Sequence, residues 1–433
     1  MFAVVSRLLL IFAAVTAISP SLARSVEPQV GGLSLLEARV CITGHDHNRP
    51  DPFPGLGDFI GWVGGINRLS NGDLLCVHSA GYWHVSFATP VLLNERLVES
   101  YVKAGFNPDH HAPTGGRIMA CRSRDNGRTW GKPETIYDGK LDCRPSTSFV
   151  TRHGTVVVIV NMQASWYGFP RAPKGRQKLN TRQLVIRSTD NGRSWSDAKP
   201  LHSFGNYYTR GHSRGLELPD GSLLWASYDM HEDSSVLDGT IHRSVDDGVS
   251  WDIHSTIRRR RPLDGAVKQP DLVVSGLPET LRALPRPNTE TWVDTDEGDL
   301  GRLSDGRLVL IVRPDGGVLI SEDNGLTWGQ IGVVGPEYLY APSLLVLADD
   351  TLVLTAGGAG GQCIYISMDA GRRWSKPFRL DPAVYGYGVL TALADGSILL
   401  GYVERHSVPQ RLLLLRFRID SNRRQIDLLA IGD

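Results

Sequence analysis

One octapeptide with the pattern Ser-x-Asp-x-Gly-x-x-Trp occurs five times in this chain of 433 residues and restricts what the chain can fold into. The copies are Ser123–Trp130, Ser188–Trp195, Ser244–Trp251, Ser321–Trp328 and Ser367–Trp374. In each copy the aspartate can bond its own backbone two residues on, the glycine adopts a positive φ without steric cost, and the tryptophan is a large apolar anchor. These are properties of a tight hairpin turn, so five copies predict a repeat architecture built from β-hairpins.

A second signal, a turn dipeptide that leads into an apolar strand, occurs six times and alternates with the octapeptides. The dipeptides are Asn71-Gly72, His153-Gly154, Asp220-Gly221, Asp305-Gly306, Asp349-Asp350 and Asp395-Gly396. Segments that follow or include them, such as Ser222–Tyr228 and Arg307–Arg313, are rich in residues that favour β-strands. Two hairpin turns per unit give four antiparallel strands, so the sequence predicts an all-β fold, a six-bladed β-propeller of four-stranded antiparallel blades.

The two ends of the sequence indicate how such a ring closes. Near the carboxyl end, Gly388–Ala394, Ser397–Val403 and Arg411–Ile419 supply three strands of the sixth blade. Glu37–Thr43 has the pattern of a strand without an obvious partner nearby in sequence. We therefore expect this segment to complete the last blade.

The first residues have the pattern of a targeting segment. Arg7 precedes an apolar run over residues 8–18, and Ser21-Leu22-Ala23 fits a small-x-small cleavage signal. Residues 1–23 are therefore expected to be a secretory signal peptide and residues 24–433 a single propeller domain. The apolar run is shorter than the roughly 20 residues that span a bilayer, and no later segment is long and apolar enough. The expected product is extracellular or periplasmic, without an integral membrane segment after signal removal.

Charge and cysteine content add two expectations. Lysine plus arginine number 46, as do aspartate plus glutamate, so the chain has no overall field that favours nucleic acid. The five cysteines cannot all pair within one exported chain. Cys76 and Cys121 fall on neighbouring predicted strands, and they form either a disulfide or two buried thiols, since a free cysteine packs as a small hydrophobe.

The octapeptide resembles the Asp-box of the sialidase superfamily, and the five boxes with six expected blades resemble the exo-sialidase propeller along the whole chain after residue 23. In that family the boxes lie on the far side from the active centre, and they also occur in propellers that are not enzymes, so a structural role is expected here. The family uses a tyrosine nucleophile, because a carboxylate would be repelled by the acid group of the substrate. A phenol with a pKa near 10 needs a neighbouring base, which in the family is a glutamate.

The last expected blade resembles the family's tyrosine-bearing strand. Tyr387 lies nine residues before the turn glycine Gly396, and Glu404 ends the next expected strand. The resemblance implies that Tyr387 is the nucleophile and that Glu404 orients an arginine. The alternative is that Tyr387 is a packing aromatic beside Tyr385.

Residues 296–313 resemble the strand pair that carries the family's base and one of its carboxylate-binding arginines. Glu297 and Arg313 fall at those positions, and an Asp-box begins eight residues after Arg313. The resemblance implies that Glu297 is the base and that Arg313 binds the substrate. A solvated glutamate and a surface arginine are the alternative.

The general acid of the family is an aspartate on a loop of the first blade. The corresponding loop here, residues 81–116, contains Asp109, which is the implied acid, with His110 as a rival proton donor. His110 and His111 have no spaced third ligand, so no metal is expected. Nothing in the sequence demands a cofactor.

The sequence departs from the family at its arginines. Three of them normally bind the substrate carboxylate, but Trp62 occupies the position of the first, and the third is absent from residues 360–366. Charged hydrogen bonds contribute about 1.5–3 kcal/mol each, so this loss weakens sialic acid binding unless other cations replace them. Arg144, Arg210 and Arg214 form either a shifted cationic pocket or structural ion pairs. Trp62 is either a stacking platform for a sugar ring or a core residue.

These features lead to three functional hypotheses. The leading one is a secreted exo-glycosidase that acts with retention on an acidic terminal sugar of a glycan or glycoconjugate, and it is favoured because Tyr387 and Glu297 stand at the family's positions. The second is a propeller that binds glycan without cleaving it, which the incomplete arginine set favours. The third is a glycosidase or lyase for another sugar, in which Trp62 changes the specificity.

Overall fold

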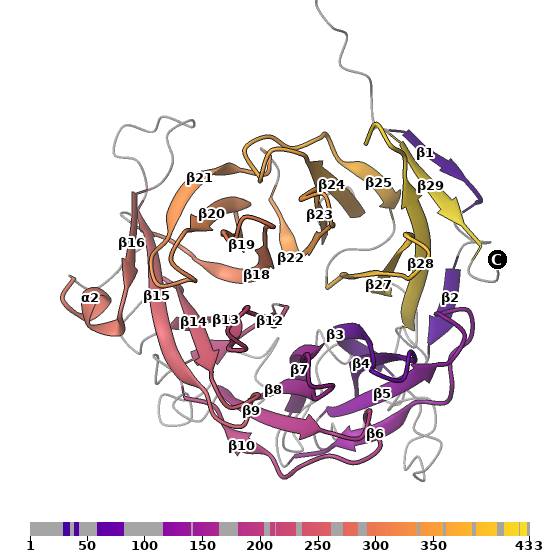
Figure 1. Cartoon of the computed structure of the whole chain (residues 1–433), viewed down its shortest axis with the longest axis horizontal. Coiled ribbons are helices and arrows are strands. Elements are labelled where there is room, and N and C mark those ends of the chain that lie inside the picture. The colour runs from indigo at the N-terminus through magenta and orange to yellow at the C-terminus, as the bar shows by residue number, and fades with distance from the viewer. Residues whose placement is uncertain are drawn as a thin grey trace, which may run out of the picture.

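The computed structural model describes residues 29–34, 39–42, 59–81, 116–139, 142–163, 181–202, 208–212, 214–230, 236–260, 272–284, 292–335, 338–357, 361–382, 387–404, 411–423 and 425–430. Their strands form six hydrogen-bonded sheets, which follow one another in chain order around a central axis (Figure 1). The core lies between neighbouring sheets, where apolar side chains of one sheet pack on those of the next, as Leu75 and Val77 pack with Val158 and Val160. The expected all-β, propeller-like arrangement of small antiparallel sheets is confirmed.

Four sheets have four strands each, with the first strand nearest the axis. One contains β3 (Phe59–Arg68), β4 (Leu74–Gly81), β5 (Arg117–Ser123) and β6 (Glu134–Tyr137). The next contains β7 (Asp142–Val150), β8 (Val156–Gln163), β9 (Thr181–Ser188) and β10 (Lys199–Pro200). The other two contain β18 (Asp296–Arg302), β19 (Leu308–Arg313), β20 (Gly317–Ser321) and β21 (Gly329–Val333), and β22 (Tyr340–Val346), β23 (Leu352–Gly357), β24 (Gln362–Ser367) and β25 (Phe378–Asp381).

Two sheets are larger than the expected unit of four strands. One contains β11 (Tyr208–Arg210), β12 (Leu216–Glu217), β13 (Leu223–Met230), β14 (Asp238–Ser244), β15 (Asp252–Arg260), β16 (Leu272–Gly276) and β17 (Trp292–Val293). The helix α2 (Pro278–Arg282) packs beside it against β15 and β16. The prediction of four strands in every sheet is therefore confirmed only in part, because β16 and β17 both pair with the outer edge of β15. Within the described ranges, no helix combines the length and the apolar content that a bilayer crossing requires.

The other large sheet joins the two ends of the described chain. It contains β26 (Val389–Ala392), β27 (Ile398–Glu404), β28 (Arg411–Ile419) and β29 (Gln425–Leu429), with β1 (Gln29–Gly32) and β2 (Arg39–Ile42) added. β2 pairs with residues 412–415 of β28, which confirms that the segment expected at Glu37–Thr43 completes the last sheet. β29 pairs with residues 416–419 along the same edge, and β1 pairs in parallel with β29. Because β26 and β27 contact β3, the last sheet adjoins the first.

The turns owe their shape to backbone that only certain residues tolerate. The second residue of all six dipeptides has a positive φ, from 60° at Asp350 to 96° at Gly306. In the octapeptide at residues 321–328, Asn324 and Gly325 follow one another with φ of 57° and 89°. Glycine adopts such a φ without strain, and asparagine and aspartate tolerate it better than other residues do. The expected turns are thus found where the sequence placed them.

The octapeptides bond many of their own polar groups internally. In the copy at 321–328, the Gly325 amide donates to Ser321 Oγ at 2.8 Å, the Thr327 amide donates to Asp323 Oδ1 at 2.8 Å, and Trp328 Nε1 donates to the Gly325 carbonyl at 3.0 Å. The aspartate therefore bonds the backbone four residues on rather than two.

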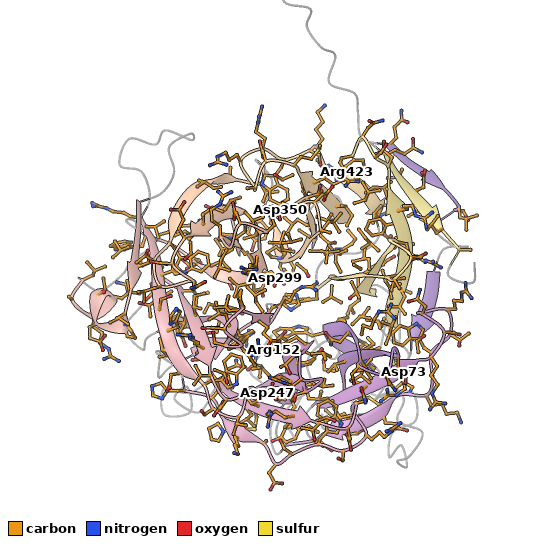
Figure 2. All side chains as sticks on the ribbon, in the orientation of Figure 1. Asp73, Arg152, Asp247, Asp299, Asp350 and Arg423 are labelled. Atoms are coloured by element: carbon orange, nitrogen blue, oxygen red, sulfur yellow. The ribbon has the colours of Figure 1, made fainter. Side chains whose placement is uncertain are left out.

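The octapeptides also join neighbouring sheets. Asp247, in the copy that follows β14, accepts hydrogen bonds from Arg187 Nη2 at 2.7 Å and from the Thr155 hydroxyl, both on the preceding sheet. Figure 2 shows Asp73, Asp247 and Asp350 over the sheets and Asp299 near the axis. These contacts agree with a structural role for the repeats.

Cys76 and Cys121 lie directly opposite each other in the β4–β5 ladder. Both are buried free thiols, so the second of the two expected arrangements is the one found.

Candidate active site

Four inner strands have an irregular pairing register near their beginnings, where several of the candidate residues lie. The shifts fall between Ile60 and Val63, Pro145 and Thr147, Asp296 and Asp299, and Tyr340 and Ser343. A bulge of this kind bends a strand and redirects a side chain. Trp62 and Glu297 lie within two of them, and both Glu297 and Tyr387 have a positive φ, of 32° and 57°. Such backbone is unfavourable for residues other than glycine and is typical of functional sites.

Tyr387 and Glu297 meet in the interior of the ring, although 90 residues separate them in sequence. The Tyr387 hydroxyl donates a hydrogen bond to Glu297 Oε1 at 3.2 Å. The two residues are only 2% and 3% exposed, so this bond is shielded from water. A phenol and a carboxylate in this arrangement can exchange a proton.

Arg313 contacts the other oxygen of the same carboxylate. Its Nη1 lies 2.7 Å from Glu297 Oε2 and 3.5 Å from Asp296 Oδ2. Its Nε and Nη2 donate to the Tyr338 hydroxyl at 2.9 and 2.6 Å, and its guanidinium carbon lies 4.5 Å from the centroid of the Tyr340 ring. The positive charge of Arg313 is therefore already balanced within the protein.

Aromatic rings enclose Tyr387. Trp62 stacks on it, with ring centroids 4.8 Å apart and an angle of 21° between planes. His212 and Tyr340 approach edge-on, at 5.1 and 5.6 Å. The Arg144 guanidinium carbon lies 5.0 Å from the Trp62 ring, so Trp62 lies between a cation and a phenol ring. Trp62 is buried, and its indole Nε1 has no hydrogen-bond partner among the described residues.

Burial sets the protonation of several groups around this cluster. It lowers the pKa of His212 to about 4, against the opposing charge of Glu297, so the imidazole is neutral at neutral pH. Burial, and then the charge of Glu297, raise the pKa of Asp296 well above its usual range. Although burial opposes its charge, Arg313 has a raised pKa because Glu297 and Asp296 stabilise the cation.

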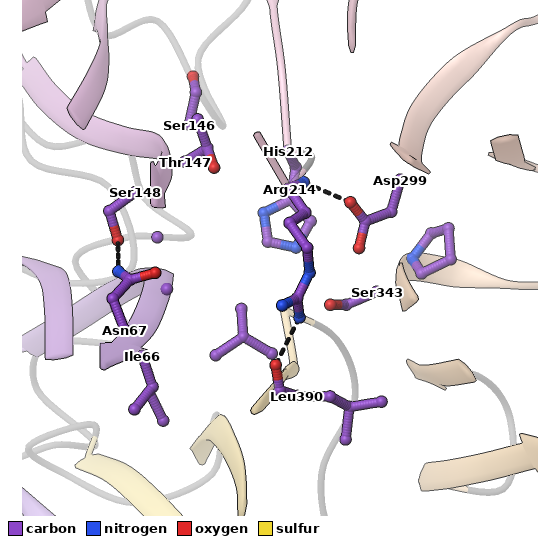
Figure 3. Close-up of a pocket in the computed structure, with 14 residues that line it drawn as sticks. Ile66, Asn67, Ser146, Thr147, Ser148, His212, Arg214, Asp299, Ser343 and Leu390 are labelled. Carbon is purple, nitrogen blue, oxygen red and sulfur yellow. Dashed lines mark hydrogen bonds between the residues drawn. The ribbon is translucent and has the colours of Figure 1, made fainter. Parts of the chain in front are cut away.

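A cavity on the axis of the ring adjoins this cluster through His212. It is lined by the inner strands of five sheets, including Ser146, Ser148, Asp299 and Ser343, and by His212 and Arg214 between β11 and β12 (Figure 3). Arg214 crosses it, because its backbone amide donates to Asp299 Oδ1 and its Nη2 donates to the Leu390 carbonyl. Arg214 therefore joins opposite sides of the ring.

The structure places the remaining predicted residues as follows. Arg144, on β7, is buried beside Trp62. Arg210 is buried at the end of β11, where its backbone pairs with Tyr228. Glu404 ends β27, but its side chain lies outside the described part of the structure, and Asp109 and His110 lie in the undescribed range 82–115. Among the described residues, no cluster of metal-ligating side chains lies at this site.

Sequence reasoning missed His212, Tyr338 and Tyr340 as members of the cluster. The signal available for His212 was its place between two arginines that begin an inner strand. Tyr338 and Tyr340 gave no motif at all, because their role depends on Arg313 from a neighbouring sheet.

Comparison with known proteins agrees with this architecture. The model of the BNR repeat-like domain family matches residues 118–302. A sialidase of Micromonospora viridifaciens is 23% identical over 329 residues, which cover 67% of this chain and 45% of the relative. The chain thus spans less than half the length of that relative.

Solved structures are similar over most of the chain at low identity. A protein of unknown function from Dyadobacter fermentans has a TM-score of 0.62 at 16% identity, covering 88% of this chain and 98% of its own. A Hadza microbial sialidase has a TM-score of 0.58 at 19% identity, covering 86% and 66%. The intramolecular trans-sialidase of Ruminococcus gnavus has a TM-score of 0.54 at 13% identity, covering 86% and 96%. Together with the five octapeptides and the ring of small antiparallel sheets, these matches show that the fold of the chain is similar to that of sialidases and that residues 118–302 are similar to the BNR repeat-like domain family.

Proposed function

We propose that this protein is a sialidase-type glycoside hydrolase that releases an acidic terminal sugar with retention of configuration. The observation that carries the proposal is the buried hydrogen bond between the Tyr387 hydroxyl and Glu297. We further propose that the six sheets are the blades of one propeller domain, residues 24–433, and that residues 1–23 direct its export. Contacts between the last sheet and the first support the single ring.

In the first step, Tyr387 Oη attacks the anomeric carbon while its proton passes to Glu297 Oε1. The bond from the anomeric carbon to the leaving oxygen breaks, and Asp109 donates a proton to that oxygen. Arg313, whose Nη1 lies 2.7 Å from Glu297 Oε2, would hold the carboxylate in place to accept the proton. In the second step, water attacks the anomeric carbon and Asp109 takes its proton. The bond to Tyr387 then breaks, and Glu297 returns its proton to the phenol oxygen.

The acid group of the sugar would be bound by Arg313 with Arg144 and Arg210, in place of the arginine set that is incomplete here. Arg144 and Arg210 are buried, so a carboxylate that reaches them interacts in a poorly screened environment. Trp62 would line the same pocket, and Glu404 would orient one of the cations. Because Arg313 is paired with Glu297, an incoming carboxylate must share it with that residue.

The experiment compares Tyr387→Phe with Tyr402→Phe on a fluorogenic sialoside and on a panel of other glycosides. Tyr402 is a matched control, because its buried hydroxyl also donates to a carboxylate, Asp381, at 3.0 Å. We expect Tyr387→Phe to lose activity by at least about 100-fold and Tyr402→Phe to retain it. A fluorinated sialoside that traps the covalent intermediate should add its mass to the peptide that contains Tyr387. Equal activity of the two variants, or a label on another residue, contradicts the proposal.

A second candidate is a propeller that binds glycan without cleaving it. It is favoured by the pairing of Arg313 with Glu297 and by the stacking of Trp62 on Tyr387, which both close the cluster to a substrate. A glycan array that reports binding unaffected by Tyr387→Phe, together with no turnover of any glycoside, would select this candidate. Turnover of a neutral glycoside but not of a sialoside would instead select a glycosidase for another sugar.

A further inference from the structure

A second cluster of reactive side chains lies in the first sheet and shares no residue with the candidate active site. Cys76 and His78 stand two residues apart on β4 and therefore on the same face of the sheet, and Cys121 is opposite Cys76 on β5. Their sulfur and imidazole nitrogen atoms all lie within 4.8 Å of one another. The two cysteines pack in the apolar interface with the last sheet, among residues such as Leu399 and Leu414.

His78 makes this cluster unusual for a protein core. Its ring is fully buried, and beyond the neighbouring Cys76 thiol neither ring nitrogen has a hydrogen-bond partner among the described residues. A buried polar group without a partner is unfavourable by roughly 1–3 kcal/mol. A disulfide between Cys76 and Cys121 would leave both nitrogens unsatisfied, whereas a metal ion held by all three side chains would give the imidazole a partner.

We propose that Cys76, His78 and Cys121 bind a single monovalent copper ion. Thiolate and imidazole donors favour soft metal ions such as copper(I) and zinc. Structural zinc is almost always bound by four ligands, and the described part of the chain adds no fourth histidine, cysteine or carboxylate to this cluster. Copper(I), in contrast, accepts three donors in a plane.

Distance and charge are compatible with this ion. Ligand bonds of about 2.0–2.3 Å at angles of about 120° place two donors on one ion roughly 3.5–4.0 Å apart, so the three side chains need only small rotations. A net charge in an apolar core is costly. One copper(I) ion, one thiolate, one thiol and a neutral imidazole carry no net charge, and binding releases one proton to solvent without any change of oxidation state. Divalent zinc at the same site would need both thiols deprotonated.

The test measures copper in the whole protein. Because the site is buried, the ion must enter while the chain folds, so the protein is expressed with added copper and purified without oxygen in a reducing buffer. We expect near one copper ion per chain after gel filtration, retained against bicinchoninate, a chelator of copper(I). Cys76→Ser and His78→Phe should each reduce retained copper by roughly tenfold or more, since each removes one of three ligands. Cys363→Ser, which changes another buried cysteine outside the cluster, should retain it.

Each other outcome overturns the proposal. No retained copper in the wild type, or equal copper in all variants, excludes this site. Retention of zinc alone excludes copper as the ion, and a mass 2 Da lower with no reactive thiol at Cys76 identifies a disulfide. If the variants fail to fold, X-ray absorption of the copper-loaded wild type decides, because the site requires two sulfur ligands and one nitrogen ligand.

Discussion

The octapeptide turns and the beginnings of the inner strands both contain buried or half-buried polar groups. The two regions differ in how far those groups are hydrogen-bonded. In the octapeptide at 321–328 the side chains of Ser321, Asp323 and Thr327 each bond a group a few residues away. Around Tyr387, in contrast, the Trp62 indole and both ring nitrogens of His212 have no hydrogen-bond partner among the described residues. The repeated turns satisfy most of their polar groups within the fold, whereas the cluster around Tyr387 leaves polar atoms available to another molecule.

This difference separates the turn residues, which stabilise the ring, from the cluster around Tyr387, which would act on a ligand. Unsatisfied buried polar atoms reduce stability, and functional sites are where proteins retain them. Substitutions in the turns should therefore change stability without changing activity, and substitutions in the cluster should change activity.

The largest effect is expected from Glu297→Gln, which keeps the shape of the side chain and removes its charge. We expect kcat/KM for a sialoside to fall by about 10²–10⁴-fold, because the base is lost. Stability should change less than activity, since Asp296 also lies 3.5 Å from Arg313. Asp381→Asn, at the carboxylate that accepts from Tyr402, is the control for activity. Full activity of the Glu297 variant would contradict the functional role of the cluster around Tyr387 and with it the difference from the octapeptide turns.

An acid-dependent loss of stability is expected from His212. Its pKa is about 4 in the folded protein, lowered by burial from 6.5, so its stabilising contribution is complete above pH 6.5 and is lost as the pH falls toward 4. Over that window the unfolded chain binds a proton that the folded protein does not, at a cost of up to about 3 kcal/mol. His212→Phe should weaken this pH dependence in urea unfolding at several pH values.

His242 offers a matched comparison, because burial lowers the pKa of this residue to about 3 and it lies on β14 away from the cluster. His242→Phe should weaken the acid sensitivity in the same way while leaving kcat/KM unchanged. If it changed activity as much as His212→Phe does, the special position of His212 would be in doubt.

A smaller effect is expected from Asp323→Ala in the octapeptide. The substitution removes the acceptor for the Leu326 and Thr327 amides and for the Thr327 hydroxyl. The free energy of unfolding should fall by about 1–3 kcal/mol, with kcat/KM unchanged. Glu322→Ala, at the adjacent exposed carboxylate, should have almost no effect on urea unfolding. An equal loss in both variants would mean that the repeated aspartate has no special structural role.

The smallest effect is expected from Arg152→Ala. Arg152 Nε lies 3.1 Å from Glu217 Oε1 and links two sheets, but its side chain is 52% exposed. Exposed ion pairs contribute less than about 1 kcal/mol and weaken with salt. Thermal unfolding at low and high salt should show a small difference that disappears at high salt. If Arg152→Ala lost as much stability as Asp323→Ala, exposed ion pairs rather than the repeated turns would be what holds neighbouring sheets together.

The sequence predicted the fold well where the signal is local. A positive φ at Gly306 or Gly325 depends on residues next to it, so the turns could be located without a structure. The strands β16, β17, β1 and β29 were missed, because each is added to the edge of a sheet that already has its expected strands. Nothing in their own residues indicates that such an edge is available.

For the candidate site, the sequence could name residues but not their contacts. Spacing from a turn glycine singled out Tyr387 and Glu297, whose hydrogen bond joins two different sheets. It could not predict that Arg313 would be paired with Glu297, or that Arg214 would cross the axis to the Leu390 carbonyl. The Arg313 contact lies within one sheet, beside the register shift between Asp296 and Asp299, and the Arg214 contact depends on how sheets are oriented across the ring. No short segment encodes either of them.

The pairing of β2 with β28 has a consequence for the order of assembly. Residues 39–42 must wait for residues 412–415, so the last sheet cannot be finished until nearly all of the described chain has left the ribosome. Until then the edge that β28 will cover stays open, and open strand edges are where chains adhere to one another. A truncation within β28 would therefore deprive a segment hundreds of positions away of its hydrogen-bonding partner and leave the ring unsealed.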